Sequence, residues 1–241
     1  SQATTVAEVY EEWIRAKPEQ WFWVHRRWKS KPDAGDVVRT ARGLEVWGKG
    51  RIGVLLDRDG TVNRDLGRGV LAPDELELLP GVGAAIRRLN DAGVAVFVTT
   101  NQAVVARGQI TETDLAAIHQ RMGEMLAKDG ARVDGIHYCP HHPTEGKGAF
   151  SRVCDCRKPL PGLLNRATAE GGLNPALSLF VGDRDTDVKA ARAAGYPVTL
   201  VSNGWAHKPW EPPTETPDHI AANLPDAIDR FLEKRFGGRD E

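Results

Sequence analysis

Two carboxylates, Asp57 and Asp59, directly follow a short apolar run at residues 52–56. The run has the length of a buried strand, and the acids and Gly60 end it. In an open α/β sheet, ligands bind outside the carboxyl ends of the strands. Gly60 allows the backbone to curl there, so both side chains can converge on one ligand. One carboxylate could then attack a substrate while the other moves a proton. Taken alone, the motif also fits a solvated turn.

Two further stretches carry groups that bind phosphate. A strand predicted at 94–99 runs into three residues whose hydroxyl and amide groups can donate to phosphoryl oxygens: Thr100, Asn101 and Gln102. Arg157 and Lys158 place two cations just before a predicted helix, where the peptide dipole also favours an anion. The alternative for Arg157 and Lys158 is a solvated pair without a ligand.

A second acidic loop follows a strand predicted at 177–181 and contains Asp183, Asp185 and Asp187. Carboxylates from two strand ends can share a hard divalent cation, and Mg²⁺ suits oxygen ligands together with a substrate phosphate. The alternative for Asp185 and Asp187 is helix capping, for which Asp is common.

All three cysteines lie close together, and with one histidine they form a candidate zinc site. Its four ligands would be Cys139, His141, Cys154 and Cys156. Three sulfurs and an imidazole are the complement of a closed tetrahedral Zn²⁺ site. We expect a structural zinc that clips a loop with little means of folding alone. His142 is the rival to His141 for the fourth position, and three reduced thiols without metal are the alternative.

Strands and helices alternate from residue 51 onward. Strands are predicted at 52–56, 94–99, 135–138, 177–181 and 198–201, and helices at 82–91, 112–128, 161–170, 185–194 and 225–236. Short apolar runs joined by amphipathic helices predict an α/β fold, with a doubly wound and mostly parallel sheet covered on both faces. Residues 1–50, rich in tryptophan, are interpreted as an appendage to a domain at 51–241. Within that domain, a proline-rich segment at 209–217 precedes the final helix.

Composition excludes several classes of protein. The 241 residues are 41% hydrophobic and 27% charged, with a formal net charge of −1. Because nucleic-acid-binding domains usually carry a basic surplus, we expect no nucleic-acid partner. No stretch approaches the roughly 20 apolar residues that span a bilayer. We therefore expect a cytoplasmic monomer acting on a small molecule.

Together and in this order, the motifs resemble those of the haloacid-dehalogenase (HAD) phosphatase superfamily over residues 51 to about 205. The resemblance implies that Asp57 is a nucleophile forming an aspartyl-phosphate. Asp59 would protonate the leaving oxygen and then activate water, while Thr100 and Lys158 hold the transferring oxygens. Mg²⁺ would be bound by the carboxylates of Asp57 and Asp183 and by the backbone carbonyl of Asp59. Asp187 would orient the loop.

Five sequence motifs of this chain resemble those of one branch of that superfamily: DRDGTVN, TTNQAVVARG, CPHHP, CDCRKPLPG and VGDRDTDV. This branch contains the D-glycero-D-manno-heptose 1,7-bisphosphate 7-phosphatases and the histidinol-phosphate phosphatases. Candidates for contacting the sugar or its second phosphate are then Asn63, Asn101, Arg107 and Arg157. The heptose enzymes usually read Asn-Gln-Ser-Gly where this chain has Ala103 and Val104, which puts the contacts of that loop in doubt. No insertion long enough for a cap domain follows Asp57 or Thr100.

Residues 18–29 resemble the C-terminal end of lipid A lauroyl-type acyltransferases, without that family's catalytic portion. Interleaved Trp and Arg also suit a membrane-surface or nucleic-acid patch, and packing on the main domain is the preferred alternative. For the whole chain we expect a sugar-bisphosphate phosphatase acting on the C7 phosphate of the heptose compound. The alternatives are a histidinol-phosphate phosphatase and a zinc-stabilised binding protein without turnover.

Overall fold

The computed structural model describes residues 37–40, 43–46, 50–202 and 212–236. A six-stranded sheet forms its centre, with the strand order β6-β5-β4-β7-β8-β9. Every neighbouring pair in this sheet is parallel. The predicted α/β class with a parallel sheet is therefore confirmed.

The strands of this sheet are short and mostly buried. Their bounds are β4 Gly53–Leu56, β5 Ala95–Asn101, β6 Gly135–Cys139, β7 Leu179–Gly182, β8 Val198–Val201 and β9 His219–Ala221. A separate antiparallel sheet precedes them and contains β1 Val37–Thr40, β2 Gly43–Val46 and β3 Gly50–Arg51. Strand β4 lies between β5 and β7, so its carboxyl end is at the middle of the sheet edge.

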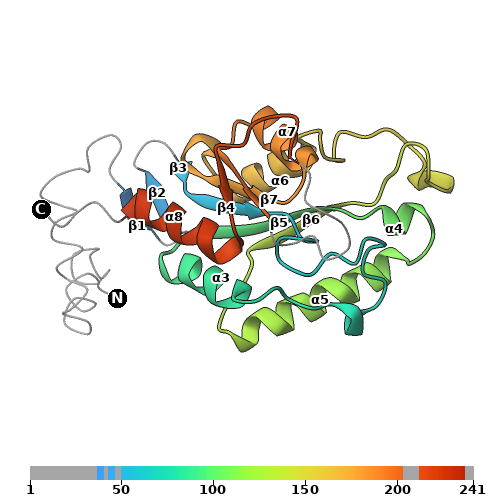
Figure 1. Cartoon of the computed structure of the whole chain (residues 1–241), viewed down its shortest axis with the longest axis horizontal. Helices are drawn as coiled ribbons and strands as arrows, with labels where there is room; N and C mark the ends of the chain where they lie inside the picture. The colour runs from blue at the N-terminus through green and yellow to red at the C-terminus, as the bar shows by residue number, and fades with distance from the viewer. Residues whose placement is uncertain (1–36, 41–42, 47–49, 203–211, 237–241) are drawn as a thin grey trace, which may run out of the picture.

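Helices cover both faces of the central sheet, as Figure 1 shows. Helices α3, α5 and α8 cover one face and span Val82–Asp91, Glu112–Lys128 and Leu224–Phe236. Helices α6 and α7 cover the other and span Gly162–Gly171 and Asp185–Ala193. A one-turn helix, α4, at Ala103–Ala106 follows β5, and three 3-10 turns lie at Pro73–Glu75, Gly148–Phe150 and Pro175–Leu177.

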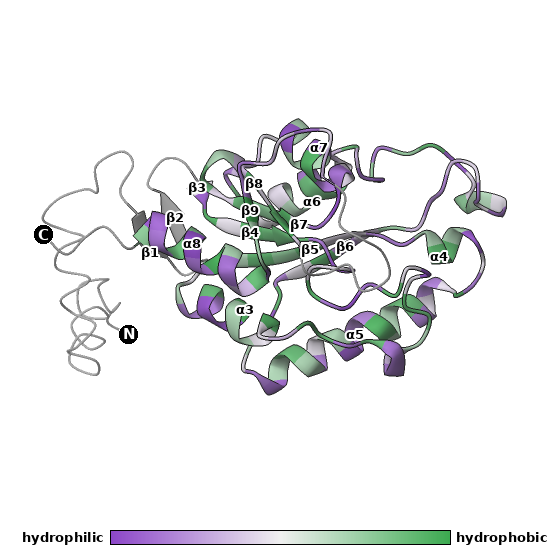
Figure 2. Cartoon of the chain, viewed as in Figure 1, coloured by the Kyte–Doolittle hydropathy of each residue, from purple (hydrophilic) through white to green (hydrophobic). Residues whose placement is uncertain are grey.

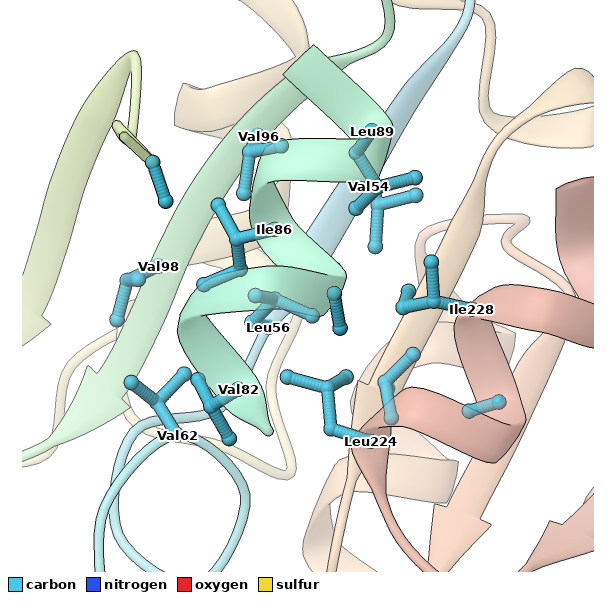
Figure 3. Packing of buried hydrophobic residues seen from close by; sticks show 14 of the residues in the cluster. Val54, Leu56, Val62, Val82, Ile86, Leu89, Val96, Val98, Leu224 and Ile228 are labelled. Carbon is cyan, nitrogen blue, oxygen red and sulfur yellow. The ribbon is translucent and has the colours of Figure 1, made fainter. Parts of the chain in front are cut away.

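Alternating strand residues fill two separate layers of core. Val54 and Leu56 of β4 point toward α3 and α8, where they pack with Ile86 and Ile228 (Figure 3). Leu55 points to the opposite face, toward α6 and α7. Figure 2 shows the same arrangement as green strands between helices whose outer faces are purple. Because both faces of the central strands β4 and β7 are buried, each of these two strands reads as a continuous apolar run.

Most predicted elements lie within two residues of their observed bounds, and the helices at 82–91 and 112–128 match in full. The prediction that a strand begins at residue 177 was wrong. Pro175 starts a 3-10 turn there, and the Asn174 side chain accepts a hydrogen bond from the Ala176 amide, so β7 begins at Leu179. Strand β9 was missed because three residues carry too little periodicity. Strands β1 and β2, inside the predicted appendage, were also missed.

The sequence predicted neither a cap domain nor a membrane-spanning helix, and the described part of the chain contains neither. The segment between β4 and α3 contains a single 3-10 turn, and α4 is the only helix between β5 and α5, so the described residues include no large cap domain. None of the described helices is long and apolar enough to cross a bilayer. The remainder of segment 1–50, including residues 18–29, and residues 203–211 of the region before α8 lie outside the described residues.

Candidate active site

The two acidic motifs meet at the carboxyl ends of neighbouring strands. Leu56 pairs with Val181 in register, and the Asp57 amide donates to the Val181 carbonyl at 2.8 Å. Asp57 and Asp183 follow these strands and are both buried. Gly60 makes the close approach possible: it has a φ of +87°, and a Cβ there would lie 2.3 Å from a carboxylate oxygen of Asp183.

Three buried carboxylates and one buried amine form the centre of the site. Asp57, Asp183 and Asp187 each place an oxygen within 4.8 Å of the others. Lys158 Nζ lies 2.6 Å from Asp57 Oδ1 and 2.7 Å from Asp187 Oδ1. It also donates to the Thr99 carbonyl at 2.9 Å. Asp187 Oδ2 accepts from the Asp183 amide at 3.2 Å, which fits its predicted role in orienting the loop.

Burial and like charge perturb these groups. Burial raises the pKa of Asp57 to about 6, an effect that Lys158 partly offsets and Asp187 reinforces. Burial, then the charges of Asp57 and Asp187, also raises the pKa of Asp183 well above its ordinary value. For Lys158, burial opposes the charged amine, but Asp187 and Asp57 outweigh it, so the net pKa is raised. The centre carries an excess of negative charge that a cation would relieve.

Asp59 is separated from this group and has its own donors. Its carboxylate accepts from Arg58 Nη2 at 2.9 Å, from Asn63 Nδ2 at 3.0 Å and from Gln102 Nε2 at 2.7 Å. Burial opposes ionisation, but Arg58, Asn63 and Gln102 lower the pKa of Asp59. In this arrangement Asp59 is an ionised carboxylate ready to take a proton.

A cavity of about 510 Å³ opens above these groups. Of the sequence-predicted residues, its wall includes Asp57, Asp59, Thr100, Asn101, Arg107, Arg157 and Lys158. The predicted substrate contact Asn63 is instead fully buried and holds Asp59 and the Arg64 carbonyl. Asn101 lines the cavity and also fixes Lys158, because its side chain pairs with both backbone groups of that residue at 3.0 Å.

Some residues of the site were missed by sequence reasoning. Arg58, between the two aspartates, was not assigned a role, although a bulky cation inside an acidic motif is a visible signal. Arg68 and Arg184 also line the cavity. Arg184 is paired with Asp65, so it ties the loop after β4 to the loop after β7. Because Asp65 and Arg184 lie on different loops, only the folded chain brings them together.

The donor set fits a hard divalent cation. Asp57 and Asp183 are buried and supply carboxylate oxygens, the type of ligand that Mg²⁺ prefers. The carboxylate of Asp59 is not in this group, and the sequence prediction assigned the backbone carbonyl of Asp59, not its side chain, to the metal. Lys158 binds two of the three acids and supplies one positive charge against them.

The three thiols and His141 form a second cluster beside the site. The Sγ atom of Cys156 lies 3.3 Å from Cys139 Sγ and 3.2 Å from Cys154 Sγ, and His141 Nδ1 lies 3.4 Å from Cys156 Sγ. These separations exceed a disulfide bond and approach the edge of a tetrahedron around a metal with thiolate bonds of about 2.3 Å. His142 is turned away, and its Nδ1 accepts from the Glu145 amide at 3.0 Å.

The cluster fits Zn²⁺ and lies next to the catalytic centre. Cys156 is two residues from Lys158 in the sequence. Arg157, between them, donates to the His141 carbonyl at 3.1 Å. The segment is fixed to α4 as well, since Arg107 pairs with Glu145 at 2.6 Å. A metal here would therefore fix both the amine of the site and two cations of the cavity wall.

Comparisons with known proteins agree with this geometry. Residues 155–227 match the HAD-hydrolase-like family model, which spans the Lys158 motif and the second acidic loop. Residues 1–30 match the bacterial lipid A biosynthesis acyltransferase model, in the segment where the sequence predicted that resemblance. The fold and the acidic site thus define a HAD-like hydrolase.

Individual relatives show to which family of HAD-like hydrolases the chain belongs. The chain is 44% identical to D-glycero-beta-D-manno-heptose-1,7-bisphosphate 7-phosphatase of Yersinia pestis, over 58% of this chain and 74% of that protein. The identity to the same enzyme of Escherichia coli K12 is 41%, over 73% and 92%. A crystal structure of D,D-heptose 1,7-bisphosphate phosphatase from B. bronchiseptica, complexed with magnesium and phosphate, has a TM-score of 0.64 and 36% identity over 76% and 99%. The chain belongs to this heptose-bisphosphate phosphatase family, and it is a phosphoric monoester hydrolase.

Proposed function

We propose that this protein hydrolyses the C7 phosphate ester of D-glycero-D-manno-heptose 1,7-bisphosphate through an aspartyl-phosphate. One observation carries the proposal: Asp57, Asp183 and Lys158 meet at the carboxyl ends of two central strands, beside a cavity lined by further cations. The names of the relatives support the substrate.

In the first half-reaction, Asp57 attacks phosphorus and the bond from phosphorus to the C7 oxygen breaks. Asp59, which takes up a proton from solvent as the substrate binds, gives that proton to the C7 oxygen, which leaves as the sugar hydroxyl. The approaching phosphate raises the pKa of Asp59, because a nearby like charge disfavours its ionised form. Lys158 and Thr100 hold the transferring oxygens during the step. In the second half-reaction, water attacks the phosphoryl group, Asp59 takes the water proton, and Asp57 is regenerated.

Two metals belong to the proposal. Asp57, Asp183 and the backbone carbonyl of Asp59 would hold Mg²⁺, whose charge offsets repulsion between the anionic nucleophile and the anionic ester. Cys139, His141, Cys154 and Cys156 would hold a structural Zn²⁺. The magnesium and phosphate in the B. bronchiseptica structure support the first assignment.

Arg107 and Arg157 suit the second phosphate of the substrate, since both are cations of the cavity wall and arginine binds phosphate through two parallel hydrogen bonds. Asn101 would contact the sugar. A cytoplasmic location, a monomeric state and the division at residue 50 stay predictions from the sequence.

The test compares phosphate release from the heptose bisphosphate and from histidinol phosphate. We expect kcat/KM to favour the heptose compound, and a clear preference for histidinol phosphate would reject the proposed substrate. Asp57→Asn should lower release more than about a thousandfold, because the nucleophile is removed. Asp74→Asn, an exposed residue on the 3-10 turn after β4, is the matched control and should leave the rate unchanged. Equal activity of the Asp57 variant and the wild type would contradict the mechanism.

A further inference from the structure

Arg58 is a fully buried cation that joins the candidate acid–base residue to helix α5. One edge of its guanidinium faces Asp59: Nε lies 3.2 Å from Oδ1, and Nη2 lies 2.9 Å from both carboxylate oxygens. The other edge faces α5, where Nη1 lies 3.2 Å from Nε2 of His119. The sequence analysis assigned no role to His119.

The chemistry of this contact fixes the state of His119. An arginine side chain can only donate, so Nε2 of His119 must accept and its proton must be on Nδ1. Burial, then the charge of Arg58, lowers the pKa of His119 to about 4, which keeps the ring neutral near pH 7. The ring also packs against Tyr138 at a centroid distance of 5.8 Å, and the Tyr138 hydroxyl donates to Glu112 at 2.9 Å. The imidazole is thus held from the sheet side as well.

We propose that His119 is a positioning residue for Asp59 and acts through Arg58, an inference that rests on the proposed phosphatase function. The guanidinium is planar and rigid, so fixing one edge fixes the direction of the other. Without an acceptor at Nε2, the buried Nη1 group loses its partner and the guanidinium can tilt. The carboxylate of Asp59 then loses the direction that its proton transfer needs, because that transfer requires hydrogen-bond geometry.

The leaving group of the substrate separates this role from a structural one. Proton donation by Asp59 matters when a sugar alkoxide leaves, but p-nitrophenolate leaves without a proton. A variant that misdirects Asp59 should therefore slow formation of the aspartyl-phosphate from the alkyl ester but not from p-nitrophenyl phosphate. Because the second half-reaction also uses Asp59 and is common to both esters, the comparison is made on the first turnover. A variant that loosens the whole fold should lose rate on both.

The experiment measures kcat, KM and the first-turnover rate of leaving-group release for both esters in the full chain with Mg²⁺. We expect His119→Leu to lower kcat on the heptose bisphosphate about tenfold, part of the 10²–10⁴ that general acid catalysis supplies, with KM unchanged. The first-turnover release of p-nitrophenolate should stay within about twofold of the wild-type rate. His119→Gln should restore the alkyl-ester rate, since an amide oxygen can accept from Arg58. Gln120→Leu, on the exposed face of the same helix, is the matched control and should change neither rate.

The outcomes distinguish the two proposals. If His119→Leu lowers both rates equally, or changes neither, the positioning role is overturned while the phosphatase function stands. If wild type cleaves p-nitrophenyl phosphate but not the heptose bisphosphate, the proposed substrate fails, and the leaving-group comparison is made with histidinol phosphate. If wild type cleaves no ester, both proposals fail. Should His119→Leu not fold, as judged by thermal unfolding, His119→Ala carries the same comparison, and an unchanged ratio of the two rates overturns the role.

Discussion

Asp57 combines two properties that oppose each other. It must be ionised to attack phosphorus, yet burial raises its pKa to about 6, with Lys158 offsetting part of the effect. A carboxylate kept in such a place destabilises the folded chain when it ionises. The site therefore trades stability for a reactive group, which is a frequent property of active sites.

A pH dependence of stability follows from this residue. The pKa of Asp57 in the folded chain, about 6, is above its ordinary value of 3.8. Its stabilising contribution is therefore complete below about pH 3.8 and is lost as pH rises through about 6. Without metal, the free energy of unfolding of wild type relative to Asp57→Asn should thus fall by roughly 2–3 kcal/mol between pH 4 and 7. Urea unfolding in chelator at several pH values measures it. A difference that stays constant over this range would contradict the argument.

Sequence reasoning placed most residues of the site because each motif is local. The acids follow apolar runs, and Lys158 follows two cysteines, so neighbours in the chain disclose them. The contact between Arg58 and His119 joins residues 61 positions apart and depends on how α5 packs on the sheet. No local pattern contains that information. Asn63 was predicted to contact the substrate because its burial against Asp59 is also a property of the folded chain, which no local pattern shows.

At the scale of elements, helices with strong signals were predicted in full. Helix α5 begins at a capping box in which Thr111 and Asp114 satisfy each other's backbone groups, and its bounds match. Short elements without such signals were missed, because β9 has three residues and α4 has four. The register of β4 against β7, which sets the approach of the two acidic loops, comes from core packing.

The turn after β4 gives a prediction for Gly60→Ala. A Cβ at this residue would collide with Asp183, and a φ of +87° strains any other residue. We expect stability to fall by about 1–3 kcal/mol and activity to fall further, because Asp183 must move. Gly172→Ala is the matched control, with a φ of +59° but open space around its Cβ. It should show the strain alone, with normal kcat. Equal activity losses in the two variants would show that the contact with Asp183 is unimportant.

At the scale of the whole molecule, the thiol cluster connects the sheet to the cavity wall. The segment that carries it begins at the end of edge strand β6 and returns at Lys158. In Figure 1 it is the yellow segment that extends from the sheet toward α4. Phe150 packs its middle against Val104, Val105 and Leu115, whereas Val153 near its end is 82% exposed. We propose that a metal on the four ligands adds to this packing and to the Arg107–Glu145 pair in ordering the segment.

Metal content tests this proposal. We expect about one zinc per chain, and His141→Ala should lower the zinc content and increase protease cleavage between residues 142 and 153, because a closed site needs four ligands. His142→Ala is the matched control, since its ring nitrogen faces the Glu145 amide and not the thiols. Elemental analysis and limited proteolysis give the two readouts. Full zinc in the His141 variant would reject the ligand set.

The described residues include no cap domain over the cavity, and this affects how new substrate specificities can arise. The reactive acids lie at strand ends whose spacing is set by core packing, whereas Arg68 and Arg107 of the cavity wall lie further along the loops. Substitutions at those two arginines alter which ester is admitted and leave Asp57, Asp59, Lys158 and Asp183 in place. Laboratory evolution toward other sugar phosphates should therefore accumulate its changes in the loops and spare the strands.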